Sequence, residues 1–106
     1  MNLRISNGQL RFRITRAEME ALLQGTPLEL ELPLAHQSLR YSIRTDNIAS
    51  SLSLEEQAGG LHLVVDKVEF ETLARKLPSR EGIERRITLG GKELLLALEV
   101  DVRRVR

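Results

Sequence analysis

The sequence predicts an α+β fold in which eight strands form one antiparallel sheet, or an open or closed barrel, together with two helices. Polar and apolar residues alternate in eight short segments separated by turn residues, which is the period of half-buried strands. Residues 9–23, an alternating strand that runs into a capped helix, are matched without a gap by residues 60–74. We therefore expect one domain over residues 1–106, built from a duplicated ββαββ unit with pseudo-repeats at about 2–46 and 48–102.

The inward-facing positions of the two copies correspond along the chain. In the first hairpins Leu10 aligns with Leu61, and the later hairpins align as well, with extra residues of the second copy near residues 79–82. The remaining aligned pairs are Phe12 with Leu63, Leu32 with Ile87, Leu39 with Leu94, Tyr41 with Leu96, and Ile43 with Leu98. Because two copies are too few for a solenoid, we interpret the repeat as a duplicated, pseudo-symmetric domain.

The first hairpin is predicted from Asn7-Gly8, which separates alternating strands at residues 2–6 and 9–14. Both residues tolerate the positive φ of a type I′ turn. Thr15 and Glu18 have the spacing of a capping box, so a helix should begin there, and Gly25 should end it.

The following strands are less sharply defined. Alternation predicts strands at residues 28–34, 39–44, 48–54 and 61–65. Asp66 and Glu69 form a second capping box, and Pro78 should stop the helix that follows. The last two strands are expected at residues 83–89, where Arg85 breaks the apolar pattern, and at 93–102, joined by a Gly90-Gly91 turn.

Composition excludes several classes of function. The 16 basic and 15 acidic residues leave a net charge of +1, so no general attraction to nucleic acid or membrane is expected. The absence of cysteine excludes disulfides, thiolate zinc sites and cysteine nucleophiles. The start of the chain lacks the apolar core of a signal peptide, and the apolar run at residues 94–98 is too short to span a bilayer, so a cytoplasmic location is expected.

The polar face of the predicted sheet is rich in arginine. The expected ligand-binding residues are Arg4, Arg11, Arg13, Arg40, Arg44 and Arg86, and Glu29, Glu31, Glu84, Glu99 and Asp101 share the face. One interpretation is a solvated face with cross-strand ion pairs. The other is a concave site, because the planar fork of arginine suits phosphate or carboxylate, and the lysines Lys67, Lys76 and Lys92 all lie elsewhere.

The duplicated unit and its eight predicted strands resemble the CYTH-like, triphosphate-tunnel fold in topology. That resemblance implies a tunnel lined by Glu and by Arg or Lys, which binds polyphosphate and a divalent metal. Glu29, Glu31 and Glu99 would then be the candidate ligands for Mg²⁺. The chain departs from the family's Glu-x-Glu-x-Lys signature, because Arg11-x-Arg13 stands on the strand before the first helix.

A closer resemblance is to a family of small bacterial proteins of unknown function. It rests on NLRISNGQLRFRITRAEME at the start and on the final hairpin GGKELLLALEVD, and it covers nearly the whole chain. The family implies a bacterial, cytoplasmic protein and no particular activity.

No catalytic motif emerges from the sequence. His36 and His62 lack metal-ligand spacing, and no serine lies in a known nucleophile motif. We favour a non-enzymatic module that binds a partner protein or a small anionic ligand on the arginine-lined face. The alternatives are a metal-dependent phosphohydrolase or polyphosphate-binding protein of CYTH-like type, and a subunit that forms a homodimer through its strand edges or charged face.

Overall fold

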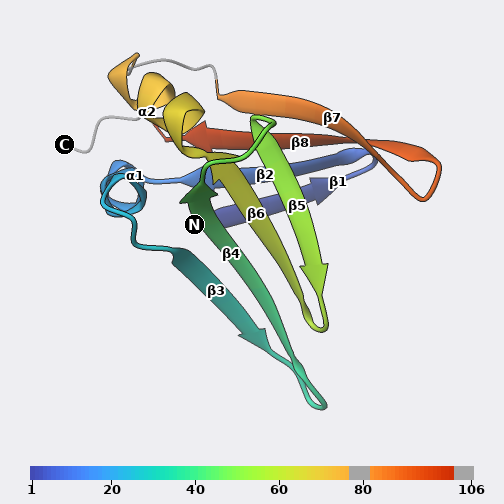
Figure 1. Cartoon of the computed structure of the whole chain (residues 1–106). Helices are drawn as coiled ribbons and strands as arrows, with labels where there is room; N and C mark the ends of the chain where they lie inside the picture. Colours follow the sequence, from blue (N-terminus) through green and yellow to red (C-terminus); the bar gives the residue numbers. More distant parts are fainter. Residues whose placement is uncertain (77–81, 102–106) are drawn as a thin grey trace.

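The computed structural model describes residues 1–76 and 82–101, and it is an α+β fold with two helices (Figure 1). Its strands form two four-stranded mixed sheets, which we call sheet A and sheet B. Sheet A has the order β1 (Asn2–Ser6), β2 (Gln9–Ile14), β8 (Lys92–Val100), β7 (Ile83–Leu89). Sheet B has the order β3 (Leu28–Pro33), β4 (Ser38–Asp46), β6 (Gly60–Asp66), β5 (Leu52–Gln57), and the helices are α1 (Arg16–Leu23) and α2 (Lys67–Arg75).

The prediction of a single eight-stranded antiparallel sheet is wrong, and the described strands do not close into a barrel. Each hairpin is antiparallel, as expected, but hairpins from different halves of the chain then pair through parallel central strands, β2 with β8 and β4 with β6. Alternation is the same in parallel and antiparallel strands, so the local pattern could not reveal these pairings.

The registers of the two sheets correspond residue by residue. Leu10 pairs with Leu96 in sheet A, and their aligned counterparts Leu61 and Tyr41 pair in sheet B. The antiparallel pairs also correspond, because Leu3↔Phe12 has its counterpart in Leu54↔Leu63, and Leu28↔Ile43 in Ile83↔Leu98. The division into two pseudo-repeats stays a prediction, and matched registers are the arrangement that two like units would give.

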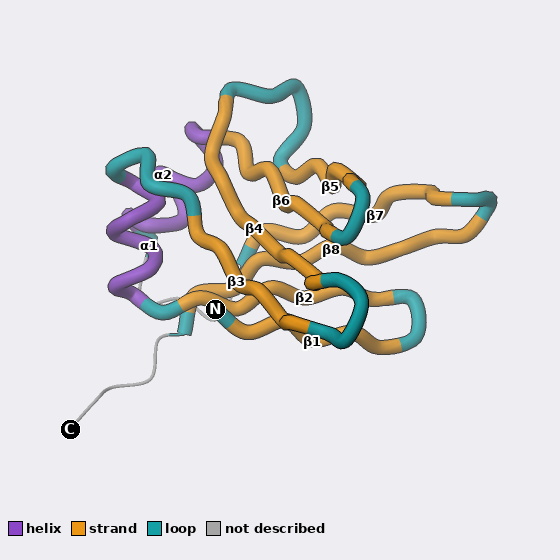
Figure 2. Tube along the Cα trace, turned by 90° about the horizontal axis from the view of Figure 1, so that it is seen from below, coloured by secondary structure: helices purple, strands orange, loops and turns teal. Residues whose placement is uncertain are grey.

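The core lies between the two sheets and beneath both helices. Phe12, Leu96 and Leu98 of sheet A and Ile43 and Leu63 of sheet B are all fully buried in one cluster. The helices add Met19, Leu22, Phe70 and Leu73 to it. Figure 2 shows the helices together at one end of the strands, so they cap the end where the sheets converge rather than covering one face of a sheet.

The positions of the predicted turns and caps are confirmed, but two details differ. Asn7 lacks the positive φ of a type I′ turn, and the amide of Asp66 donates to Ser51, so the second cap is not the predicted capping box. Ser6 pairs with Gln9 across Asn7-Gly8, and Leu89 pairs with Lys92 across Gly90-Gly91. In the first cap the Thr15 side chain accepts from the amide of Glu18 and the Glu18 carboxylate accepts from the amide of Thr15. At the second helix Asp66 accepts from the amide of Glu69 at 3.2 Å.

The strand predicted at residues 48–54 begins later, at Leu52. The preceding segment is held as a loop by Asp66, whose carboxylate accepts from the amide of Ile48 and whose amide donates to the carbonyl of Ser51. The second helix ends at Arg75 and the last strand at Val100, short of the predicted ends. Pro78 and Val102 themselves lie outside the described residues. In the described part of the chain, no helix has the length and apolarity needed to cross a membrane.

Candidate functional site

The structure divides the six predicted arginines between two surfaces. Arg4, Arg11, Arg13 and Arg86 lie on sheet A, and Arg40 and Arg44 lie on sheet B. All alternate with residues that face the common core, so each points to the outer face of its own sheet. Because the inner faces of the sheets face each other, the outer faces are separate surfaces.

Three of these residues, Arg4, Arg11 and Arg13, form what we call the arginine cluster. Arg4 on edge strand β1 stands directly opposite Arg11 on β2, and Arg13 follows on the same face of β2. Arg11 donates to Glu99 at 2.6 Å and to Gln9 at 3.1 Å. The cluster therefore concentrates positive charge at the β1 side of sheet A.

The hollow beside the arginine cluster is shallow. It has a volume of about 30 Å³, and Asn2 and Glu99 complete its lining. That is about the space of one water molecule, so the cluster presents guanidinium groups on an open surface and does not line a tunnel. Arg13 and Asp101 approach to 3.9 Å at its margin.

The outer face of sheet B carries a different set of groups. Glu29, Ser42, His62 and Glu55 occupy one row across four adjacent strands. Ser42 Oγ and His62 Nδ1 share a hydrogen bond of 2.5 Å. A hollow of about 330 Å³ lies here, lined by Glu29, Leu30, Glu31, Arg40, Tyr41, Ser42 and His62.

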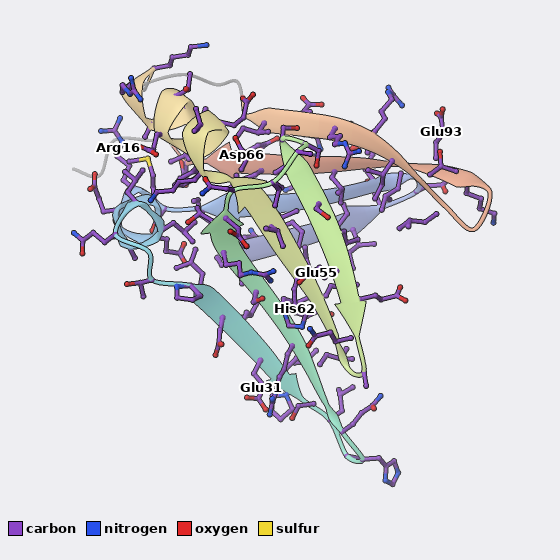
Figure 3. The ribbon with its side chains drawn as sticks, viewed as in Figure 1. Arg16, Glu31, Glu55, His62, Asp66 and Glu93 are labelled. Atoms are coloured by element: carbon purple, nitrogen blue, oxygen red, sulfur yellow. The ribbon has the colours of Figure 1, made fainter. Side chains whose placement is uncertain are left out.

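The sheet B row ends at Glu55, which forms a bidentate, solvent-exposed ion pair. Arg44 donates to both oxygens of Glu55, at 2.8 and 3.2 Å, and this hydrogen bonding lowers the pKa of the Glu55 carboxyl. Figure 3 shows Glu55 and His62 on neighbouring strands of this sheet. The imidazole of His62 lies close to Gly60, because a Cβ built on Gly60 would be 3.1 Å from His62 Nε2.

The predicted metal ligands are not brought together. Glu29 and Glu31 share the outer face of β3 in sheet B, whereas Glu99 pairs with Arg13 in sheet A. Within residues 1–76 and 82–101, no three acidic or histidine side chains form a group that could hold a metal ion. The carboxylate arrangement expected of a triphosphate tunnel is therefore not what these three residues make.

Comparison with known families supplies the identity. Residues 1–104 match the family of unknown function DUF7009. The chain belongs to this family. A comparison with curated proteins gives no match.

One contact between the two sheets of this DUF7009 chain was not predicted from the sequence. Arg85, which breaks the apolar pattern of β7, pairs with Leu96 and so lies on the inner face of sheet A. Its Nη1 donates to the carbonyl of Leu52 at 2.8 Å, which joins edge strand β7 to edge strand β5 of the other sheet. A charged residue at an apolar position of a strand was the available signal.

The Ser42–His62 contact could not be found from the sequence either, because it depends on the parallel pairing of β4 with β6. Chemically, a serine hydroxyl bound to a histidine is one part of a nucleophilic site, which also needs a group that orients the histidine. The neighbouring carboxylate of Glu55 accepts two hydrogen bonds from Arg44 instead.

Proposed function

We propose that this DUF7009 protein is a non-enzymatic binding module whose arginine cluster takes an anionic group of a partner, a carboxylate or a phosphate. The observation that carries the proposal is the direct opposition of Arg4 and Arg11 across β1 and β2. Like charges directly opposite each other in a sheet destabilise the pair. An anion bound between them turns this repulsion into attraction.

The internal counter-charges do not remove the need for such an anion. Glu99 accepts from Arg11 and Asp101 lies 3.9 Å from Arg13, whereas no ion pair of Arg4 is found within the described residues. Guanidinium groups bind carboxylate and phosphate through two parallel hydrogen bonds, which suits an open cluster of this kind. The side chains of Arg11 and Arg13 are partly exposed and accessible to a ligand.

The non-enzymatic part of the proposal is supported by the sheet B face. A hydrolytic histidine needs an orienting acceptor, and the carboxylate next to His62 is engaged by Arg44. The serine and histidine line the hollow of about 330 Å³ on sheet B, and their hydrogen bond joins β4 to β6.

The test uses tripolyphosphate as the probe anion, with binding measured by calorimetry and by the change in melting temperature. We expect the wild-type chain to bind and to be stabilised, and the double variant Arg4→Gln, Arg13→Gln to lose both effects. Arg11 is left in place because it binds Glu99 and Gln9. The matched control is Arg86→Gln, which removes an arginine from the same face at β7, beside Glu93.

Binding should weaken as salt is raised, because exposed charges are screened. Equal affinity of the wild-type chain and the double variant would contradict the proposal, as would an equal loss in the Arg86→Gln control.

A further inference from the structure

Each of the two sheets has two edge strands, so the molecule has two sides at which an edge of sheet A faces an edge of sheet B. One side, which we call the closed seam, lies between β5 and β7, and Arg85 crosses it to bind the carbonyl of Leu52. The other, which we call the open seam, lies between β1 and β3 (Figure 2). Under the alignment of the two halves, the position of Arg85 corresponds to Leu30 on β3, so the residue that joins the closed seam has no charged counterpart at the open one.

The open seam exposes apolar side chains that face inward. Ile5 on β1 is 68% exposed, and Leu30 and Leu32 on β3 are 40% and 50% exposed. Ile5 pairs with the buried Leu10, and Leu30 lies on the same face as the buried Ile43, so these side chains belong to the core-facing side of their sheets. Leu34, just beyond β3, is also 50% exposed.

The two strands of the open seam carry complementary charges. The outer face of β1 presents Arg4, and the outer face of β3 presents Glu29 and Glu31. Both strands are sheet edges with unpaired backbone groups, which are templates for pairing with another strand. A segment that suits β3 must alternate apolar residues with basic ones, and Leu3-Arg4-Ile5 of β1 has that pattern.

We propose that the chain forms a two-fold symmetric dimer in which β1 of each copy pairs with β3 of the other. The inference rests on the proposed function, since Glu29 and Glu31 of the second copy supply the carboxylates that Arg4 takes. The interface is closed and self-complementary, because each copy contributes one basic and one acidic edge.

The strand directions fit this arrangement. Both β1 and β3 run away from the helices, inclined to each other (Figure 1). A two-fold axis between these two directions exchanges them, so β1 of one copy would run parallel to β3 of the other, as β2 does with β8 and β4 with β6. The core-facing sides then join, and Ile5 meets Leu30 and Leu32 of the second copy. The other two-fold arrangement would pair β1 with β1 and β3 with β3, which places like charges against each other.

The test is a charge exchange read by light scattering and sedimentation. We expect the wild-type chain to be a dimer. The single variant Arg4→Glu and the double variant Glu29→Arg, Glu31→Arg should each weaken dimerisation by about 100-fold or more, because each sets like charges against each other at both β1–β3 contacts between the copies. An equimolar mixture of these two variants should form a heterodimer, since opposite charges then meet at both β1–β3 contacts between the copies. Arg86→Glu, on the same outer face but distant from the seam, should remain dimeric.

A further variant tests the apolar part of the proposed interface. Leu30→Arg, which places at the open seam the residue type found at the closed one, should be a folded monomer by circular dichroism. A monomeric wild-type chain, or a mixture that stays monomeric, would overturn the dimer.

The anion function is tested independently on Glu29→Gln, Glu31→Gln, which keeps the arginine cluster and removes its acidic partner. Tripolyphosphate binding by this variant, together with a monomeric wild-type chain, overturns the dimer and leaves the proposed function standing. A dimer that passes the charge exchange without tripolyphosphate binding supports the interface and removes the free small anion as a ligand.

Discussion

The Arg85 contact across the closed seam should be measurable as stability. Replacing Arg85 with Met keeps a long apolar stem and removes the hydrogen bond of 2.8 Å to the carbonyl of Leu52. A charge-assisted hydrogen bond contributes roughly 1.5–3 kcal/mol. The net loss should be smaller here, about 1 kcal/mol, because Arg85 is exposed and the carbonyl keeps a second donor in Ser50 Oγ at 3.1 Å.

For a domain of this size, about 1 kcal/mol corresponds to a fall in melting temperature of about 4–8 °C. Calorimetry on the Arg85→Met variant measures it, and Arg86→Met is the matched control, since Arg86 is the next residue of β7 and faces solvent. Hydrogen exchange should accelerate along β5 and β7 and stay unchanged along β1. Equal melting temperatures for the two variants would refute the assignment of Arg85 to the seam.

Three further predictions concern sheet B and the first helix cap. Gly60→Ala should destabilise the chain by about 1–3 kcal/mol, because its Cβ would lie 2.8 Å from a backbone carbonyl and 3.1 Å from His62; urea unfolding measures it. Arg44 lowers the pKa of Glu55, so the ion pair stabilises the fold above the ordinary carboxyl pKa and loses that effect as pH falls through the lowered pKa of Glu55. The difference in melting temperature between the wild-type chain and Glu55→Gln should therefore shrink from neutral pH to about pH 3. Thr15→Ala should cost about 1 kcal/mol in thermal unfolding, since it removes the cap of α1.

The elements that the sequence predicted well are those whose cause is local. The turn at Asn7-Gly8 needs a glycine at its second position, where φ is +74°, and the cap at Thr15 needs one partner three residues away. Neither depends on distant parts of the chain. The inward positions were also predictable, because Phe12 and its aligned counterpart Leu63 are both fully buried.

The pairing of the sheets could not be predicted in the same way. Leu10 alternates with Arg11 whether β2 has an antiparallel or a parallel neighbour, and nothing near it in the chain specifies β8. The single arginine face followed from assuming one sheet, so Arg40 was grouped with Arg11 although the two lie on different sheets. Ser42 and His62 were likewise unremarkable until β4 and β6 were placed side by side.

The proposed dimer rests on a difference between the two seams of a fold whose halves correspond in register. Duplication would make both seams alike, and the residues at corresponding positions, Arg85 and Leu30, make them different. Arg85 donates its hydrogen bond within the chain, whereas Leu30 is 40% exposed at the open seam. Corresponding positions therefore carry different side chains at the two seams, while Phe12 and Leu63 of the shared core are both fully buried.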